Sequence, residues 1–103
     1  MPSADVFQAV ADPTRRRLLE MLAGEERSVS DLAGGFPVTL SAISQHMRVL
    51  REAGLVSVRR AGRERLYRLN PEPLRAVADW VGQYEAFWQG RLDALGRHLE
   101  ETP

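Results

Sequence analysis

The chain has 103 residues, a formal net charge of zero and no cysteine, and 44% of its residues are apolar. These values predict one domain over residues 1–103 with a modest core, and they argue against disorder, disulfides and thiolate metal ligands. No stretch approaches the roughly 20 apolar residues of a membrane span and no signal-peptide pattern is present, so we expect a cytoplasmic protein without membrane association.

Two helices are expected first. One covers about residues 3–11. The next begins at Asp12 and Pro13, because aspartate caps a helix N-terminus and proline suits the first helical position, and it ends near Gly24. The apolar residues of the pair are Val6, Phe7, Val10, Leu18, Leu19 and Leu22.

Residues 28–53 predict a helix-turn-helix. Ser28 and Asp31 have the spacing of a capping box that opens a brief helix, which ends at a pair of glycines. The next helix begins at Thr39, a typical N-cap residue, and ends at Gly54. Two helices joined by a short glycine-containing turn, the second with a polar free face, are typical of this motif.

The second of these helices has a packing face and a polar face when its residues are placed on a wheel. The residues Ile43, Met47 and Leu50 fall within about 60° of one another. On the opposite side, within about 100°, lie Ser41, Ser44, Gln45 and Arg48. A face of this composition suits base edges and phosphates, with ordinary solvation as the alternative. The DNA contacts predicted from this helix are Thr39, Leu40, Ser41, Ser44, Gln45, Arg48 and Arg51.

The zero net charge hides an uneven distribution. Residues 41–75 hold eight arginines against three glutamates and carry +5, whereas residues 1–40 carry −2 and residues 76–103 carry −3. One basic zone in a neutral chain is typical of a surface that meets a polyanion.

A β-hairpin is predicted within that zone, over residues 55–69. Two β-prone segments flank Gly62, which can adopt the positive φ that a tight turn needs. Directly after a helix-turn-helix, a basic hairpin can reach the DNA backbone or the minor groove, and a structural hairpin with solvated ends is the alternative. The arginines predicted to contact DNA are Arg59, Arg63 and Arg65.

A long C-terminal helix is predicted over residues 71–100, with Asn70 as its cap and Pro71 in its first position. Its apolar stripe is about 45 Å long, more than a small chain covers by itself, so we expect burial against a second copy. Gly82, Gly90 and Gly96 each weaken this helix and are expected to mark a kink or a close helix approach. The predicted interface residues are Val6, Phe7, Trp80, Tyr84, Phe87, Trp88, Leu92 and Leu95. An aromatic pocket for a small molecule is the alternative for the aromatic cluster.

Three segments in combination, residues 7–19, 44–56 and 62–69, resemble the arsenical-resistance-repressor (ArsR) family of bacterial winged-helix regulators. The resemblance implies a homodimer joined through the first and last helices, operator binding, and repression relieved by a ligand or signal. The family's recognition helix corresponds to residues 39–53. Leu40 stands where the family has a polar residue just after the helix cap, which leaves an apolar contact with a thymine methyl at that position.

Metal sensing separates this chain from much of that family. No cysteine is present for arsenic, cadmium or lead. The zinc-sensing members use histidines and carboxylates on the last helix, where this chain has His98 without a second histidine at ligand spacing. His46 is expected to be hydrogen-bonded at the edge of the core. We therefore predict no metal site and no cofactor, as in cysteine-free relatives that act as autorepressors or respond to an unidentified inducer.

Together these observations predict a mainly α fold with a β-hairpin wing, that is, a winged helix-turn-helix with N- and C-terminal dimerisation helices. The expected function is a homodimeric, sequence-specific transcriptional repressor of an inverted-repeat operator in double-stranded DNA, with autoregulation and a small-molecule inducer as further expectations. A winged-helix module for protein contacts and a zinc-responsive repressor are the alternatives. No catalytic constellation or phosphate loop is present, so an enzyme is not expected.

Overall fold

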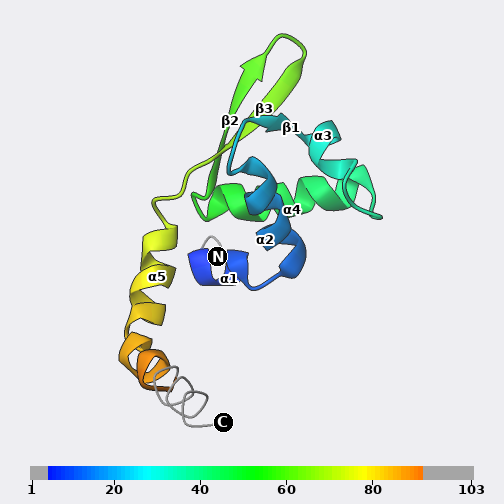
Figure 1. Ribbon diagram of the computed structural model, residues 1–103. Helices are drawn as coiled ribbons and strands as arrows, with labels where there is room; N and C mark the ends of the chain where they lie inside the picture. Colours follow the sequence, from blue (N-terminus) through cyan, green and yellow to red (C-terminus); the bar gives the residue numbers. More distant parts are fainter. Residues whose placement is uncertain (1–4, 92–103) are drawn as a thin grey trace.

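The computed structural model describes residues 5–91, which form a helical body, a projecting hairpin and a C-terminal helix (Figure 1). The elements in chain order are α1 (Val6–Val10), α2 (Pro13–Leu22), β1 (Arg27–Ser28), α3 (Val29–Ala33), α4 (Leu40–Glu52), β2 (Val56–Ala61), β3 (Glu64–Leu69) and α5 (Leu74–Gly82). The predicted fold class, mainly α with a hairpin wing, is confirmed.

Side-chain caps begin the first three helices. Asp5 forms a capping box with Gln8 at the start of α1, so this helix begins later than the sequence predicted. The Asp12 carboxylate accepts a hydrogen bond from the Arg15 N–H at 3.0 Å and begins α2 as expected. The Ser28 hydroxyl accepts from the Asp31 N–H at 3.1 Å at the start of α3.

The core lies where α1, α2, α3 and α4 meet the base of the hairpin. Its buried hydrophobic residues are Val6, Ala9, Leu18, Leu19, Leu22, Leu32, Ile43, Met47, Leu50, Leu55 and Val56. The prediction that Val6 lies at a dimer interface is wrong, because this side chain is 9% exposed within the core of its own chain. Its neighbour Phe7 points outward and is 43% exposed.

The strands form an antiparallel sheet in the order β1-β3-β2. The predicted hairpin is confirmed to within a residue at its strand ends. Ala61 pairs with Glu64, so the loop has two residues, and Gly62 has a φ of +65° while Arg63 does not have a positive φ. A positive φ at the first loop position alone is typical of a type II′ turn. The sequence did not predict β1, which pairs with β3 at Tyr67 and Leu66.

The C-terminal helix differs from its prediction at its start and in its continuity. Asn70 does not cap it. The Asn70 side chain donates to the Gly54 carbonyl at 2.8 Å and its backbone N–H donates to the Leu55 carbonyl at 2.8 Å, so these groups are held at the α4–β2 turn. Helix α5 begins at Leu74 without a side-chain cap and ends at Gly82, and helical geometry resumes over residues 85–91. The helix is interrupted directly after Gly82, as expected, whereas it continues through Gly90. Gly96 and the rest of residues 92–100 of the predicted helix lie outside the described residues.

Candidate nucleic-acid interface

Helix α4 is held at both ends by local hydrogen bonds. The Thr39 hydroxyl accepts from the backbone N–H three residues later at 3.0 Å, which confirms the predicted N-cap. At the other end, Gly54 has a φ of +78°. The Gly54 N–H donates to the Arg51 carbonyl at 3.0 Å and the Leu55 N–H donates to the Leu50 carbonyl at 2.9 Å. These two bonds form a Schellman motif, so both ends of the helix are defined by residues that the sequence singled out.

The two faces of α4 lie as the wheel predicted. The core side carries Ile43, Met47 and Leu50, all completely buried. The solvent side carries Ser41, Ser44, Gln45 and Arg48, which are exposed and are called the polar face of α4 below. At its N-terminal end, Leu40 is 53% exposed. Thr39 and Arg51 are also exposed. The structure thus brings all seven predicted contact residues of this helix to the surface.

Arg48 makes an exposed ion pair with Glu52 one turn later, with Nε 3.4 Å from Oε1. Such exposed pairs are weak and screened by salt, so the arginine can exchange this partner for a phosphate.

Arg15 connects α4 to the N-terminal helix. Its Nε donates to the Ala9 carbonyl at 2.7 Å, and a terminal nitrogen donates to the Gln8 carbonyl at 3.0 Å. Its other terminal nitrogen lies 3.3 Å from Nδ1 of His46 on α4, and the Asp12 carboxylate lies 3.9 Å from the same ring nitrogen. The expectation that His46 is hydrogen-bonded at the edge of the core is confirmed.

The charges of this network act on Asp12. Burial by itself would raise the pKa of the Asp12 carboxyl, but the hydrogen bonds from the Arg15 and Thr14 N–H groups and the electrostatic interactions with the nearby His46 and Arg15 side chains outweigh it. The net result is a pKa below the ordinary value, which keeps the N-cap of α2 ionised.

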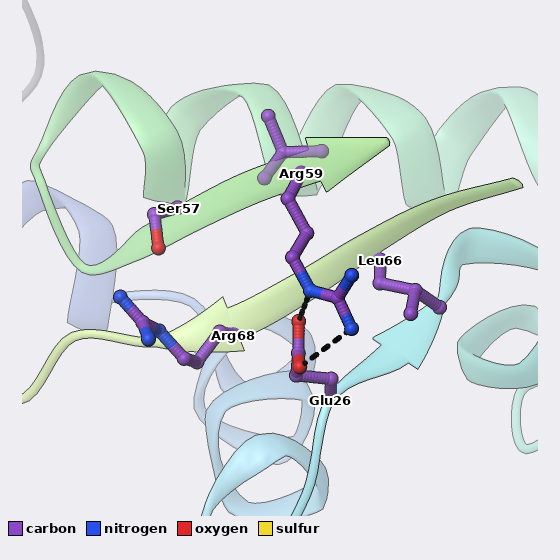
Figure 2. A pocket seen from close by; sticks show the side chains of 6 residues that line it. Glu26, Ser57, Arg59, Leu66 and Arg68 are labelled. Atoms are coloured by element: carbon purple, nitrogen blue, oxygen red, sulfur yellow. Dashed lines mark hydrogen bonds and ion pairs between the residues drawn. The ribbon is translucent and has the colours of Figure 1, made fainter. Parts of the chain in front are cut away.

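The arginines of the hairpin differ in whether they form an ion pair with another part of the protein. Arg63 at the turn and Arg65 on β3 are exposed, and neither forms an ion pair within residues 5–91. Arg60 lies opposite Arg65 in the register and adds a third exposed charge, which the predicted contacts omitted although the charge count included it. Arg59 differs, because both oxygens of the Glu26 carboxylate hold its guanidinium (Figure 2).

A cluster of exposed aromatic residues lies where α1 and the C-terminal helix meet. The Phe7 and Trp80 rings are 6.1 Å apart at 87°, and the Trp80 and Tyr84 rings are 5.8 Å apart at 70°. Phe87 and Trp88 form a further edge-to-face pair. These five residues, called the aromatic patch below, are each 43–56% exposed. Trp80, Tyr84 and Trp88 line a shallow cavity of about 270 Å³ together with Val81.

Neighbouring exposed apolar side chains of this kind are typical of interaction sites. Five of the eight predicted interface residues are therefore in the aromatic patch, Val6 is buried in the core, and Leu92 and Leu95 lie outside the described residues.

Within residues 5–91 there is no group of three His, Cys, Asp or Glu side chains that could hold a metal ion, and His98 lies outside this range. In the same part of the chain, no helix has the length and apolar character to cross a membrane.

Comparison with known proteins gives a consistent set of similarities. A family model described as a helix-turn-helix domain matches residues 10–59. The HTH-type transcriptional regulator Rv2034 of Mycobacterium tuberculosis is 43% identical over 94 residues, which cover 91% of this chain and 85% of that protein. The transcriptional repressor SdpR of Bacillus subtilis is 35% identical over 77 residues, which cover 75% of this chain and 86% of that protein.

Two solved structures extend this similarity to the fold. An ArsR-like transcriptional regulator from Rhodococcus sp. RHA1 superposes with a TM-score of 0.71 at 35% identity, covering 95% of this chain and 90% of that one. The homodimeric winged helix-turn-helix DNA-binding domain of Mb0332 from Mycobacterium bovis superposes with a TM-score of 0.64 at 30% identity, covering 79% of this chain and 78% of that one.

Proposed function

Because the chain belongs to the ArsR family of winged helix-turn-helix transcriptional regulators, we propose that it is a homodimeric repressor that binds an inverted-repeat operator. The family consists of DNA-binding regulators and not of enzymes. The observation that carries the proposal is the polar face of α4, exposed on a helix whose other face is buried. It lies on the same domain as a hairpin whose Arg60, Arg63 and Arg65 are exposed and form no ion pair within residues 5–91.

In this proposal the polar face of α4 enters the major groove. Gln45 offers an amide that can bond bidentately to adenine, and Arg48 can reach guanine or a phosphate once it leaves Glu52. Leu40 at the N-terminal end of the helix offers an apolar contact with a thymine methyl. Arg63 at the hairpin turn reaches the phosphate backbone, which contributes affinity without sequence preference.

The aromatic patch supports a position for the second copy. A two-fold axis through this surface would bury the exposed rings of Phe7, Trp80 and Tyr84 against their equivalents, and two-fold dimers are the commonest oligomers. The Mb0332 domain, of the same fold, is homodimeric. Two α4 helices related in this way would contact half-sites whose centres are about one helical turn, roughly 34 Å, apart.

The test is a titration of the DNA upstream of the protein's own gene, by fluorescence anisotropy at physiological salt, against a random duplex of equal length. We expect the upstream DNA to bind more tightly by at least about 10³-fold, the lower end for specific regulators. Equal affinities would refute the proposal of an autoregulated operator. A panel of upstream fragments from neighbouring genes then separates autoregulation from control of other genes.

Two variants separate the roles of helix and hairpin. Gln45→Ala should reduce the preference for the operator, with a loss of about 1–3 kcal/mol at a directly read base, and leave random-DNA affinity unchanged. Arg63→Ala should weaken binding to both duplexes and lower the salt dependence by about one phosphate per protomer. Arg75→Ala is the matched control, because it removes an exposed arginine of α5 that pairs with Glu72 and belongs neither to the polar face of α4 nor to the hairpin.

A further inference from the structure

One arginine of the hairpin is tied to the body of the protein. On β2, Nε of Arg59 donates to Oε2 of Glu26 at 2.7 Å and Nη2 donates to Oε1 at 3.1 Å. Glu26 precedes β1, and the strand order is β1-β3-β2. The pair therefore crosses the whole sheet, from its outermost strand over β3 to the segment that enters β1 (Figure 2).

The pair lies on the face of the sheet that points away from the core. Side chains alternate along a strand, and on β2 it is Val56 and Val58 that face inward while Ser57 and Arg59 face outward. The outward residues Ser57, Arg59, Leu66 and Arg68 line a cavity of about 250 Å³ with Glu26 and Val58. Figure 2 shows the two side chains meeting over β3 in this hollow.

Outside the six residue pairs with β3 and the buried Val56 at its start, β2 has little support near the turn. Beyond Val58 the β2 residues Arg59 and Arg60 are exposed, so no core packing orients the tip of the hairpin. β2 is bonded in the sheet to β3 alone, and β3 is attached to β1 through two residue pairs. A bidentate bond from the middle of β2 to Glu26 restrains the twist of this ribbon independently of the strand ladder.

We propose that the Glu26–Arg59 pair positions the basic wing on DNA, and that Arg59 is a positioning residue and not a phosphate contact. The proposal rests on the DNA-binding function proposed above. It assigns the backbone contacts of the wing to Arg60, Arg63 and Arg65, whose orientation then depends on a carboxylate that precedes β1.

The electrostatics agree with a persistent ion pair. The hydrogen bond from Arg59 lowers the pKa of the Glu26 carboxyl, burial opposes it, and the charges of Arg59 and Arg68 lower it further. Glu26 is thus ionised at neutral pH and neutralises the arginine that it holds. Exposed pairs contribute little to global stability, so removal of either partner should leave a folded protein and change DNA binding instead.

The experiment measures operator affinity and its salt dependence for Glu26→Gln, Arg59→Gln and the double variant. Each single variant should lose about 2- to 30-fold in affinity, the range for residues that act on a site without contacting the ligand. The double variant should lose no more than the worse single variant, because both substitutions remove the same pair. The salt dependence should change alike in Glu26→Gln and Arg59→Gln, because both substitutions act through the same wing contacts and Arg59 itself neutralises no phosphate.

Two controls match the charge changes while keeping the pair. Glu25→Gln removes a neighbouring carboxylate that pairs with Arg27, and Arg68→Gln removes a positive charge from the same outward face. Glu25→Gln should bind DNA at least as tightly as the wild type, because it only reduces negative charge. A loss of affinity in Glu26→Gln but not in Glu25→Gln therefore identifies the pair, and not the change of charge, as the cause.

Two results would overturn the inference. If Arg59→Gln lowers the salt dependence by about one phosphate per protomer while Glu26→Gln binds as well as or better than the wild type, then Arg59 contacts DNA and Glu26 competes for it. If all three variants bind like the wild type, the pair does not position the wing. Wild-type protein that binds no duplex would refute the proposed function as well, whereas either result above leaves that function intact.

Discussion

The aromatic patch makes dimerisation the most directly testable part of the proposed function. Trp80 is the residue to change, because its ring contacts Phe7 of α1 on one side and Tyr84 of the C-terminal helix on the other. Its side chain is 51% exposed in the single chain. We expect Trp80→Ala to convert the dimer to a monomer at micromolar concentration.

The magnitude follows from the exposed area. A tryptophan can bury up to about 250 Å², so the exposed half is roughly 125 Å². At about 25 cal/mol per Å² this area is worth about 3 kcal/mol, and a two-fold interface contains it twice. Full coverage by the partner gives about 6 kcal/mol, or about 10⁴-fold in the dimer dissociation constant, and half coverage gives about 10²-fold.

The assay is sedimentation velocity over a concentration series, combined with operator titration. Operator affinity should fall together with dimerisation, because separate protomers lose the effective concentration of the second half-site. Weak binding to random DNA should persist, since the polar face of α4 is untouched. Arg75→Ala on the same helix should behave like the wild type in both measurements.

A monomeric wild type would refute this reasoning. So would a Trp80→Ala variant that remains dimeric and binds the operator fully. Either result removes the aromatic patch from the interface, and the cavity beside Trp80, Tyr84 and Trp88 then becomes the candidate site for a small-molecule inducer.

Three further predictions concern stability. Leu50→Ala should lower the free energy of unfolding by about 2–5 kcal/mol in urea titrations, because this side chain is completely buried, and a loss below about 1 kcal/mol would contradict the core described here. Thr39→Ala should cost about 1 kcal/mol through loss of the cap of α4, whereas Thr39→Ser should retain most of it. Asp12→Asn keeps a capping side chain but removes the carboxylate, whose pKa is lowered in the folded state. Its destabilisation should be complete above about pH 5 and disappear as the pH falls through the folded pKa, and a pH-independent difference would show that the charge is irrelevant.

Features encoded within a few residues were predictable from the sequence. The caps at Asp12 and Thr39 and the positive φ of Gly54 and Gly62 depend on local chemistry, and each is present in the structure. The two faces of α4 were also predictable, because helical periodicity alone places Ile43, Met47 and Leu50 on one side of the helix.

Features that depend on distant partners were not predictable. β1 has only two residues, and these form a strand because they pair with Tyr67 and Leu66 of β3, which lie far away in the sequence. The sequence position of Asn70 is typical of a helix cap. In the structure its side-chain amide and its backbone N–H instead donate to the carbonyls of Gly54 and Leu55, and α5 begins only at Leu74. Arg59 and Glu26 are 33 positions apart, so the sequence, which places Arg59 in a basic hairpin after a helix-turn-helix, did not predict their ion pair.

The burial of Val6 on the short helix α1 also depends on distant residues, which the sequence did not reveal. Its position in the core determines how α1 is held beside the proposed dimer interface. With Val6 in the core and Phe7 against Trp80, α1 is fixed to the body on one side and contributes to the aromatic patch on the other. Arg15 bonds the carbonyls of this same helix and contacts His46 on α4. A continuous set of packed and hydrogen-bonded residues therefore joins the proposed interface to the proposed recognition helix. Since no flexible linker lies between them, we expect the dimer to fix the distance between its two α4 helices and so to tolerate little variation in half-site spacing.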